Sequence, residues 1–334
     1  MAGLKDITLK INGTQFTIGL DNSEGDINYL SHAHADHLFS FKKKVVCSPT
    51  TALLAEIKEE LVEFNFKKEI KLYNAGHIIG STQIKLTTEE FGEVVYSGDL
   101  KLRDGLTTKA AEIVECDTLI IDGTYGAYDI KFRELQTYQE MKKWAEENKN
   151  CNIIWGGYKI GKAQEIIKFL NDYLNISPLV SKEIARVCKI YQKEGIKLDY
   201  IELQSQEAKE ILKGQFHAVL DFQKVNDRFI ENLNRIYKNK TLGALATGWA
   251  YLYQKKSNFI KMFGLSDHAD FSEILQYCQQ SGAKRVFVAF GENKKTVARL
   301  KKHNIKAYPI EELKSQPQAK KHQFEQLKLN LFLN

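Results

Sequence analysis

Three histidines and an aspartate lie within six residues, in the stretch His-Ala-His-Ala-Asp-His that begins at His32. Imidazole nitrogens and carboxylate oxygens are ordinary zinc ligands. Because residues two apart in an extended loop point the same way, His32 and His34 can hold one ion together. Asp36 and His37, where we expect the chain to turn into a helix, can face a neighbouring ion. The alternative is a surface histidine cluster that binds stray metal.

Two later residues extend this group. His77 follows a predicted strand, and the flanking glycines Gly76 and Gly80 permit a tight loop that presents its imidazole. A lone histidine there is otherwise usually structural. Asp99 ends an apolar strand just after Gly98, and its two carboxylate oxygens can bridge two ions. Two ions about 3.5–4 Å apart can clamp a phosphodiester from both sides, so the sequence predicts two adjacent metal sites that share Asp99.

Short strands must position these side chains in the first third of the chain. Apolar runs separated by turn residues predict strands at 27–30, 44–47, 69–73, 82–86, 93–96 and 118–122, and apolar spacing predicts a helix at 51–64. After about Tyr125 the chain alternates between strands and helices, as in a parallel α/β layer, with strands at 152–155 and 217–220 and helices at 132–147 and 162–174. The last third predicts strands at 259–264, 285–290 and 305–309 and a helix at 271–280.

Composition narrows the class of protein. With 334 residues, of which 43% are hydrophobic and 27% charged, the chain can fill a sizeable core, which excludes extensive disorder. No apolar run approaches the roughly 20 residues that cross a bilayer, so we expect no membrane association. Five scattered cysteines without a Cys-x-x-Cys pair favour a reducing, cytoplasmic location. The net charge of +6 permits a nucleic-acid partner without requiring one.

The histidine and aspartate motifs, at these spacings, resemble the metallo-β-lactamase fold. Later stretches narrow the resemblance to the β-CASP nucleases within it: Asp-Gly-Thr-Tyr-Gly at 122–126, Gly-Lys-Ala-Gln-Glu at 161–165, Thr-Gly-Trp at 247–249 and Phe-Gly-Leu-Ser-Asp-His-Ala-Asp at 263–270. Within that family the chain most resembles the DNA-ligase-associated exonuclease, or mRNA 3′-end processing factor-like, branch. The resemblance spans nearly the whole chain.

The resemblance implies an α/β fold in which a metallo-β-lactamase αββα sandwich carries an inserted α/β β-CASP domain. We expect residues 1–126 to form the first part of the metallo-β-lactamase domain, 127–258 the β-CASP insert and 259–334 the rest of the first domain. It also implies a metal site made by His32, His34, Asp36, His37, His77 and Asp99.

The resemblance assigns roles to two further residues. Phosphodiester hydrolysis needs a proton for the leaving oxygen, and His268 can supply it as general acid. Asp122 would orient His268 and favour its charged form. Asp36 can accept the proton of the attacking water. The alternatives are a satisfied half-buried histidine at 268 and a turn carboxylate at 122.

Lys162 begins a predicted helix after a glycine, where an ammonium and backbone N–H groups can hold a substrate phosphate. An ordinary solvated first-turn lysine is the alternative. Trp249 can stack on a base, although packing between the domains is the favoured role. His217, His303 and His322 match no motif, so we expect them to be structural or exposed.

One position departs from the family pattern. RNA-processing members carry another metal-ligating histidine where this chain has Phe290, and phenylalanine cannot bind zinc. We therefore expect one firmly bound Zn²⁺ at His32, His34, His77 and Asp99, a second ion that is weaker or absent, and Mn²⁺ as an alternative metal.

The sequence thus favours a zinc-dependent nuclease, a DNA exonuclease acting in repair, with DNA preferred over RNA as partner. The resemblance also implies association with a DNA ligase and a helicase. An RNA-processing β-CASP nuclease and a nucleic-acid-binding pseudoenzyme with a degraded second metal site remain as alternatives. A small-molecule hydrolase is disfavoured, since the long insert would roof the metal site and form a groove suited to a polymer.

Overall fold

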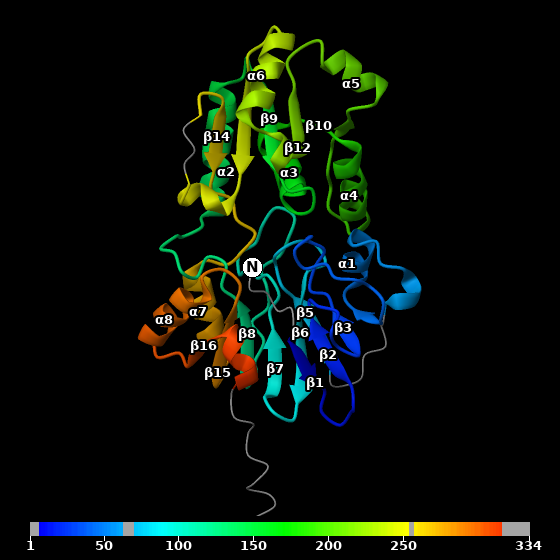
Figure 1. The fold of residues 1–334 in the computed structure, drawn as a ribbon. Coiled ribbons are helices and arrows are strands. Elements are labelled where there is room, and N and C mark those ends of the chain that lie inside the picture. The colour runs from blue at the N-terminus through cyan, green and yellow to red at the C-terminus, as the bar shows by residue number, and fades with distance from the viewer. Residues whose placement is uncertain (1–6, 63–69, 254–256, 316–334) are drawn as a thin grey trace, which may run out of the picture.

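The computed structural model describes residues 7–62, 70–253 and 257–315. It is a mixed α/β fold with three β-sheets. Figure 1 shows two bodies, one above the other, joined by crossing segments of chain. The lower body holds a four-stranded sheet and a six-stranded mixed sheet, and the upper body holds a six-stranded parallel sheet. Within the described residues, no helix is long and apolar enough to cross a bilayer.

The four-stranded sheet consists, in spatial order, of β1 (Thr8–Lys10), β2 (Thr17–Leu20), β3 (Ile27–Tyr29) and β4 (Val45–Val46). The mixed sheet consists of β16 (Ala307–Pro309), β15 (Arg285–Ala289), β8 (Thr118–Asp122), β7 (Gly92–Tyr96), β6 (Thr82–Thr88) and β5 (Ile70–Asn74). Strands β16, β15, β8 and β7 run parallel, whereas β7, β6 and β5 are antiparallel neighbours.

The lower body is built in four layers because each sheet buries an apolar face on both sides. Ile18 and Leu20 of the four-stranded sheet pack in one cluster with Ile84, Val94 and other residues of the mixed sheet. The opposite face of the mixed sheet packs against α7 (Phe271–Gln280) and α8 (Asn293–Lys302). A smaller cluster joins the outer face of the four-stranded sheet to α1 (Pro49–Leu54). Burial of these apolar side chains is the main stabilising term.

The parallel sheet has the order β11 (Ile201–Glu202), β10 (Leu179–Val180), β12 (His217–Asp221), β9 (Asn152–Gly157), β13 (Thr241–Ala246) and β14 (Ile260–Phe263). Every residue of β9 and β13 is buried, as expected where helices cover both faces. Helices α2 (Glu134–Glu147), α3 (Lys162–Leu174) and α4 (Lys182–Lys193) pack in the cluster on one face. Helices α5 (Gln206–Ile211) and α6 (Asp227–Ile236) pack in the cluster on the other.

Several details differ from the sequence expectations. The helix expected at 51–64 is wrong in length: α1 ends at Leu54, Glu56 adopts a left-handed φ of 54°, and only the short 3₁₀ turn η1 (Glu59–Leu61) follows before the described chain stops at 62. The helix expected after Asp36 is also absent, because residues 35–37 form a turn that no helix follows before Pro49. The expected strands also do not include β1 and β2, although apolar Ile7, Leu9 and Ile11 alternate with polar residues around β1.

The division of the chain into the segments 1–126, 127–258 and 259–334 remains a proposal. One observation concerns the boundary expected between residues 258 and 259. Strand β14 pairs in parallel with β13, so residues 260–263 extend the sheet of the upper body rather than the mixed sheet. His322 and most of the lysine- and glutamine-rich stretch after Leu313 lie outside the described residues. The remaining 3₁₀ turns are η2 (Phe222–Lys224), η3 (Gly248–Tyr251) and η4 (Ile310–Ser315). All five cysteines are free.

A candidate metal centre with an acid–base pair

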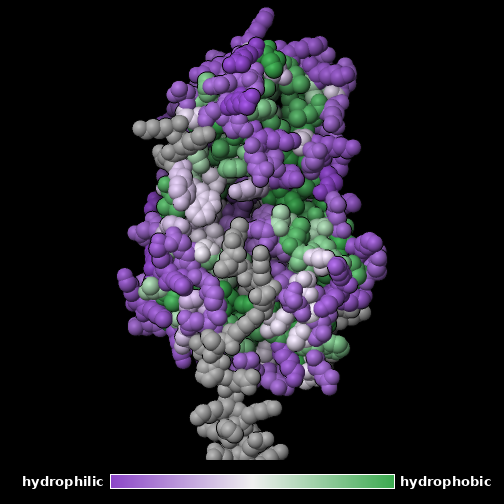
Figure 2. Space-filling view, in the orientation of Figure 1, coloured by the Kyte–Doolittle hydropathy of each residue, from purple (hydrophilic) through white to green (hydrophobic). Residues whose placement is uncertain are grey.

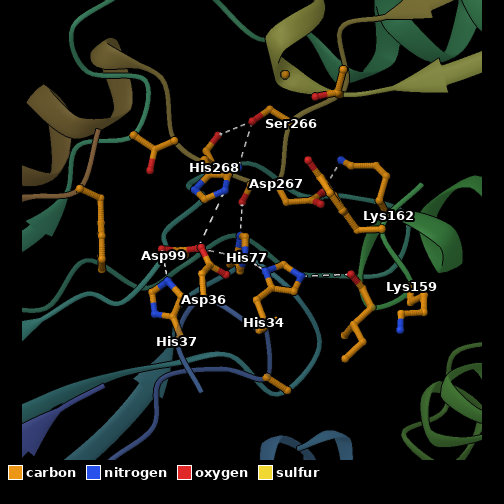
Figure 3. A pocket seen from close by; sticks show the side chains of 18 of the residues that line it. His34, Asp36, His37, His77, Asp99, Lys159, Lys162, Ser266, Asp267 and His268 are labelled. Atoms are coloured by element: carbon orange, nitrogen blue, oxygen red, sulfur yellow. Dashed lines mark hydrogen bonds and ion pairs between the residues drawn. The ribbon is translucent and has the colours of Figure 1, made fainter. Parts of the chain in front are cut away.

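The candidate site lies where parallel-running strands of the mixed sheet end. Strands β5, β7 and β8 run in the same direction, so their carboxyl ends share one edge. His77 follows β5, Asp99 follows β7, and Asp122 is the last residue of β8. His32 and His34 come from the loop after β3, and His268 from the segment between β14 and α7. Figure 3 shows the labelled side chains of this set converging on one space.

Two glycines allow these loops to come close. At Gly76, with φ of 72°, a Cβ atom would lie 2.2 Å from the Lys101 carbonyl oxygen, so a side chain there would displace the loop that carries His77. At Gly98, with φ of 55°, a Cβ atom would lie 2.6 Å from Cβ of Ser31. The missing side chain therefore lets Asp99 approach the histidine loop.

Four predicted ligands are gathered at one point. Ligand atoms of His32, His34, His77 and Asp99 lie within 4.8 Å of one another. Oδ2 of Asp99 is 3.4 Å from Nε2 of His32 and 3.4 Å from Nε2 of His77. His32, His77 and Asp99 are buried. The structure thus brings together the first predicted set, from three separate loops.

Hydrogen bonds on the outer side of two histidines fix which nitrogens face this point. Nε2 of His34 donates to the carbonyl oxygen of Ile160 at 3.1 Å, and Nδ1 of His77 donates to that of Asp267 at 2.8 Å. Burial lowers the pKa of both rings, so each is neutral and its inner nitrogen carries no proton. Those inner nitrogens, Nδ1 of His34 and Nε2 of His77, are 2.9 Å apart. Two facing lone pairs at this separation repel each other unless a cation lies between them.

His32 adds a second sign that this point can bind a cation. Its Nδ1 contacts the Ser31 hydroxyl at 3.0 Å, while its fully buried Nε2 has no hydrogen-bond partner. A buried polar atom without a partner is costly unless a ligand completes its contacts. Burial, more than any neighbouring charge, lowers the pKa of this ring well below its usual value. Three neutral imidazole nitrogens and one carboxylate therefore form a donor set that fits a divalent metal ion.

The predicted second ion would lie on the other side of Asp99. Nε2 of His37 is 3.3 Å from Oδ1 of Asp99, so the two carboxylate oxygens face different histidines. The Asp36 side chain is exposed and lines the same cavity. Among the described residues, neither Asp36 nor His37 belongs to a cluster of three or more ligand atoms within 4.8 Å. Their service as ligands of a second ion stays a prediction.

Asp21, just after β2, is a site residue that the sequence did not reveal. Its Oδ2 accepts hydrogen bonds from Nδ1 of His37 at 2.8 Å and from the Tyr96 hydroxyl at 2.6 Å. Its oxygens also accept from the backbone N–H and the hydroxyl of Ser31. Burial opposes protonation of His37, but the charges of Asp99 and Asp21 outweigh it and raise the His37 pKa well above its usual value. Asp21 thus fixes the orientation and charge of His37.

His268 and Asp122 form the predicted pair. Nδ1 of His268 donates to Oδ2 of Asp122 at 2.9 Å, and Nε2 of His268 points towards the ligand cluster, 3.9 Å from Oδ2 of Asp99. Asp122 is itself held by bonds from the backbone N–H and the hydroxyl of Thr124. Burial opposes protonation of His268, but Asp99 and Asp122 outweigh it and raise its pKa to about 9.

Lys162 is buried rather than solvated. Its ammonium donates to Oδ1 of Asp267 at 2.7 Å, and its side chain is almost fully covered (Figure 3). Since the backbone oxygen of Asp267 accepts from His77, this ion pair also supports the orientation of a predicted metal ligand. Phosphate binding by Lys162 stays a prediction, and the ion pair gives a structural alternative.

Phe290 occupies the place that the resemblance reserves for a further ligand. It follows β15, has a left-handed φ of 60°, and its ring centroid lies 5.1 Å from that of His37. Phe290, His37 and Asp36 line the same cavity. The structure therefore places an apolar ring beside the predicted second ion.

The site opens into a cavity of about 1060 Å³ between the two bodies. Predicted metal ligands, among them His34, His77 and Asp99, form its floor. The opposite side is lined by residues at the ends and in the loops of the parallel sheet, among them Tyr158, Lys159, Lys162, Asp221 and Gln223. Figure 2 shows this hollow with hydrophilic side chains above it and hydrophobic side chains to its right. A cavity of this size accommodates a segment of a polymer as well as a small ligand.

Comparison with known proteins identifies relatives along most of the chain. No protein-family model matches it. It is 26% identical over 309 residues to a probable DNA ligase of Opitutus terrae, covering 85% of this chain but 29% of that protein. It is 27% identical over 275 residues to an RNase J-like protein of Methanocaldococcus jannaschii, covering 71% and 65% of the two chains. The chain thus spans less than two thirds of the length of either relative.

Two further comparisons concern a shorter relative and the fold. The chain is 31% identical over 136 residues to an uncharacterized protein in the lig 3′ region of Acidianus ambivalens, covering 39% of this chain and 91% of that one. A crystal structure of a protein of unknown function from Enterococcus faecalis V583 shares the fold, with a TM-score of 0.55 and 13% identity over 80% of this chain and 76% of that one. On these relatives and the motifs that build the site, the chain belongs to the β-CASP nuclease family of metallo-β-lactamase-fold proteins.

Proposed function

We propose that this protein is a zinc-dependent nuclease that hydrolyses phosphodiester bonds of nucleic acid. The observation that carries the proposal is the convergence of His32, His34, His77 and Asp99 with unprotonated nitrogens turned inward. The cluster lies at the floor of a cavity of about 1060 Å³. The layers of the lower body are consistent with a metallo-β-lactamase αββα sandwich, and the parallel sheet is consistent with an inserted β-CASP domain.

The proposed reaction needs a metal ion, which the protein must bind from solution. His32, His34, His77 and Asp99 would hold the first Zn²⁺, and Asp36, His37 and the second oxygen of Asp99 a weaker second ion, with Mn²⁺ as an alternative. A bound divalent ion acts as a Lewis acid on the phosphate and lowers the pKa of water. Asp99 can serve both positions because its two oxygens face different histidines.

His268 is the proposed general acid. The charge of Asp122 and its hydrogen bond to Nδ1 favour the protonated ring, and Nε2 points towards the ligand cluster. The bond from Nδ1 to Asp122 fixes the ring so that Nε2–H is the proton available to a leaving oxygen. Asp122 therefore acts by positioning His268 and by stabilising its charge.

Asp36 is the proposed acceptor for the proton of the attacking water. Its carboxylate is exposed and lines the cavity, opposite the face where His268 projects in Figure 3. An acid and a base on opposite sides of the scissile phosphate match the needs of an in-line displacement. Leaving-group protonation and water activation are then separate tasks of separate residues.

For the substrate we propose DNA, and for the reaction an exonuclease step in repair. A probable DNA ligase and a protein of a lig 3′ region among the relatives favour this assignment and association with a DNA ligase. For association with a helicase the support is the resemblance of the motifs, and for a cytoplasmic location it is the scattered cysteines. The second candidate, an RNA-processing nuclease, is favoured by the RNase J-like relative. A nucleic-acid-binding pseudoenzyme is the third, because Phe290 faces the second ion position.

One experiment separates the three candidates. Purified protein is assayed for bound metal and then given end-labelled single-stranded DNA and RNA of matched sequence, with added Zn²⁺ or Mn²⁺. The proposal expects about one bound metal and shortening of DNA faster than of RNA. Faster cleavage of RNA would select the RNA-processing candidate, and tight binding without cleavage in either metal would select the pseudoenzyme.

A further inference from the structure

An aromatic ring that lines the cavity, that of Tyr158, lies beside the ring of Phe222. Tyr158 directly follows β9, and Phe222 directly follows β12. These strands are parallel neighbours, and the register pairs Gly157 with Asp221, so the next residue of each strand lies at the same height. Their ring centroids are 5.2 Å apart and the ring planes differ by 22°, which is a stacked arrangement.

The pair has one supported side and one open side. Phe222 is half-buried and packs against the apolar cluster under that end of the parallel sheet. Tyr158 is 45% exposed and lines the cavity above the metal centre. A large aromatic side chain that is exposed in a cavity and stacked on a second ring presents a ring face to a ligand in that cavity.

The platform lies close to the chemistry. Ile160, two residues after Tyr158, accepts the hydrogen bond from Nε2 of His34. Two residues of chain span at most about 7 Å, so the Cα atom of Tyr158 lies within about that distance of Ile160, whose carbonyl oxygen contacts His34. Burial and then the charge of nearby Asp36 raise the pKa of the Tyr158 phenol, so its ring is neutral.

A cation flanks the platform. Lys159 is exposed, lines the same cavity, and makes no ion pair among the residues that the structure describes. Trp249, by contrast, is half-buried, with its ring 4.7 Å from that of Tyr125 and 5.9 Å from that of Tyr128. An open ring beside a free ammonium is the combination that binds single-stranded nucleic acid, through base stacking and phosphate contact.

We propose that Tyr158, backed by Phe222, is a binding residue that stacks on an unpaired base of the substrate strand next to the scissile phosphate. This inference rests on the proposed function and deepens it. In a duplex each base face is covered by its neighbour, so the platform has nothing to bind unless the strand is unpaired or frayed. The contact is tolerant of sequence because every base offers a ring face.

The test compares a normal strand with one that lacks bases. Affinity is measured by fluorescence anisotropy for a labelled single strand with phosphorothioate linkages, which slow cleavage, and for the same backbone with abasic units. Tyr158→Ala is expected to weaken binding of the normal strand by about 5- to 150-fold, the range for loss of one stacked base. It is expected to leave the affinity for the abasic strand within about twofold.

Two variants serve as controls for misfolding and for a general loss of surface aromatics. Tyr158→Phe keeps the ring and is expected to keep the affinity, which shows that position 158 tolerates substitution and that the hydroxyl is not the contact. Phe16→Ala removes another exposed aromatic ring, one that is not among the residues lining the cavity, and is expected to change neither affinity.

Three outcomes overturn the inference. Equal weakening of both strands by Tyr158→Ala would mean that the ring supports the fold or the backbone contact, and no weakening of either would mean that it contacts no base. Failure of the unaltered protein to bind either strand would instead remove the proposed function itself. Binding of a blunt hairpin duplex as tightly as the single strand, with the same sensitivity to Tyr158→Ala, would also contradict the platform.

Discussion

Histidines are buried in two regions of this molecule, and their surroundings differ. In the parallel sheet, His217 of β12 is buried, accepts one hydrogen bond at Nδ1 from Nε1 of Trp155 at 3.2 Å, and has its pKa lowered to about 4 by burial. At the edge of the mixed sheet, His32 and His77 are buried just as deeply, but their unprotonated nitrogens face a carboxylate, Asp99. Burial lowers the pKa in both regions.

The difference lies in what the nitrogens face. His217 is a core residue whose acceptor atom has a partner, so it needs nothing more. In the candidate metal centre, the unprotonated nitrogens of His34 and His77 face each other and that of His32 has no hydrogen-bond partner. This arrangement is unfavourable unless a cation is bound. A buried neutral imidazole therefore indicates a ligand only when its lone pair points at other ligand atoms. Substitutions in the two regions should then have opposite consequences for metal binding.

The largest effect is expected from removing the shared carboxylate. Asp99→Ala should abolish firm metal binding and reduce cleavage of labelled DNA by at least about 10³-fold, because the stabilisation that a metal gives the transition state amounts to several kcal/mol. Metal content is measured by elemental analysis and cleavage by gel. His217→Asn is the matched control in the other region and should retain both metal and activity. Parental cleavage by Asp99→Ala would show that the metal centre is wrongly assigned.

Replacing the proposed acid should separate catalysis from metal binding. His268→Ala is expected to keep the first metal, since His268 is not in the cluster of His32, His34, His77 and Asp99. Its single-turnover cleavage rate should fall by about 10²–10⁴-fold, the usual contribution of a general acid. His303→Ala, which alters an exposed histidine outside the cavity, serves as the control. An unchanged rate would make His268 a structural residue.

The buried histidine of the parallel sheet, His217, should make the free energy of unfolding depend on pH. The pKa of His217 is about 4 in the folded chain against 6.5 for the free side chain, so the unfolded chain takes up the proton first as pH falls. Its contribution to stability is therefore present above about pH 6.5 and is lost as the pH falls towards about 4, amounting to about 2–3 kcal/mol between pH ~7.5 and ~4.5.

His217→Asn removes the titrating group while leaving an oxygen that can accept from Trp155. Denaturant unfolding of both proteins at the two pH values measures the effect. The stability of the variant relative to the parent should rise by about 2–3 kcal/mol on acidification. A pH-independent difference would contradict the assignment of His217 as a buried neutral ring.

Local patterns predicted much of the framework. The strand at 118–122 and the helices at 162–174 and 271–280 have the limits that the sequence indicated, because their apolar periodicity and their turn or capping residues agree. The helix at 51–64 failed, since the left-handed Glu56 breaks a pattern that apolar spacing alone would continue. Strands β1 and β2 have three and four residues and were not expected, although apolar and polar residues alternate at 7–11.

The site divides in the same way. Motif spacing singled out His32, His34, His77 and Asp99, and the structure gathers them, although their role as ligands stays a prediction. The sequence did not indicate Asp21 as a site residue, because Asp-Asn-Ser at 21–23 is typical of a turn. Its partners His37 and Tyr96 are 16 and 75 residues away. Such contacts depend on how strands of separate sheets face each other, which no local pattern encodes.

The smallest expected effect is a change in metal stoichiometry. It concerns the predicted second ion position, beside His37 and Phe290. The unaltered protein should hold one metal firmly and lose a second on dialysis, because Phe290 offers no ligand beside His37. Phe290→His should raise the bound metal towards two per chain. The backbone favours this exchange, since position 290 has a φ of 60° and histidine is among the residues that tolerate left-handed conformations better than most.

The competing possibility is that a neighbouring side chain already replaces the missing ligand. Asp21 is the nearest such group to His37, but its two oxygens accept four hydrogen bonds, from His37, Tyr96 and twice from Ser31, and are not free. Phe290→Leu removes the aromatic ring without adding a ligand and should leave the stoichiometry near one. Two equally tight metals in the unaltered protein would defeat this view, because Phe290 would then cost the second position nothing, and the contrast between the two sides of Asp99 would vanish.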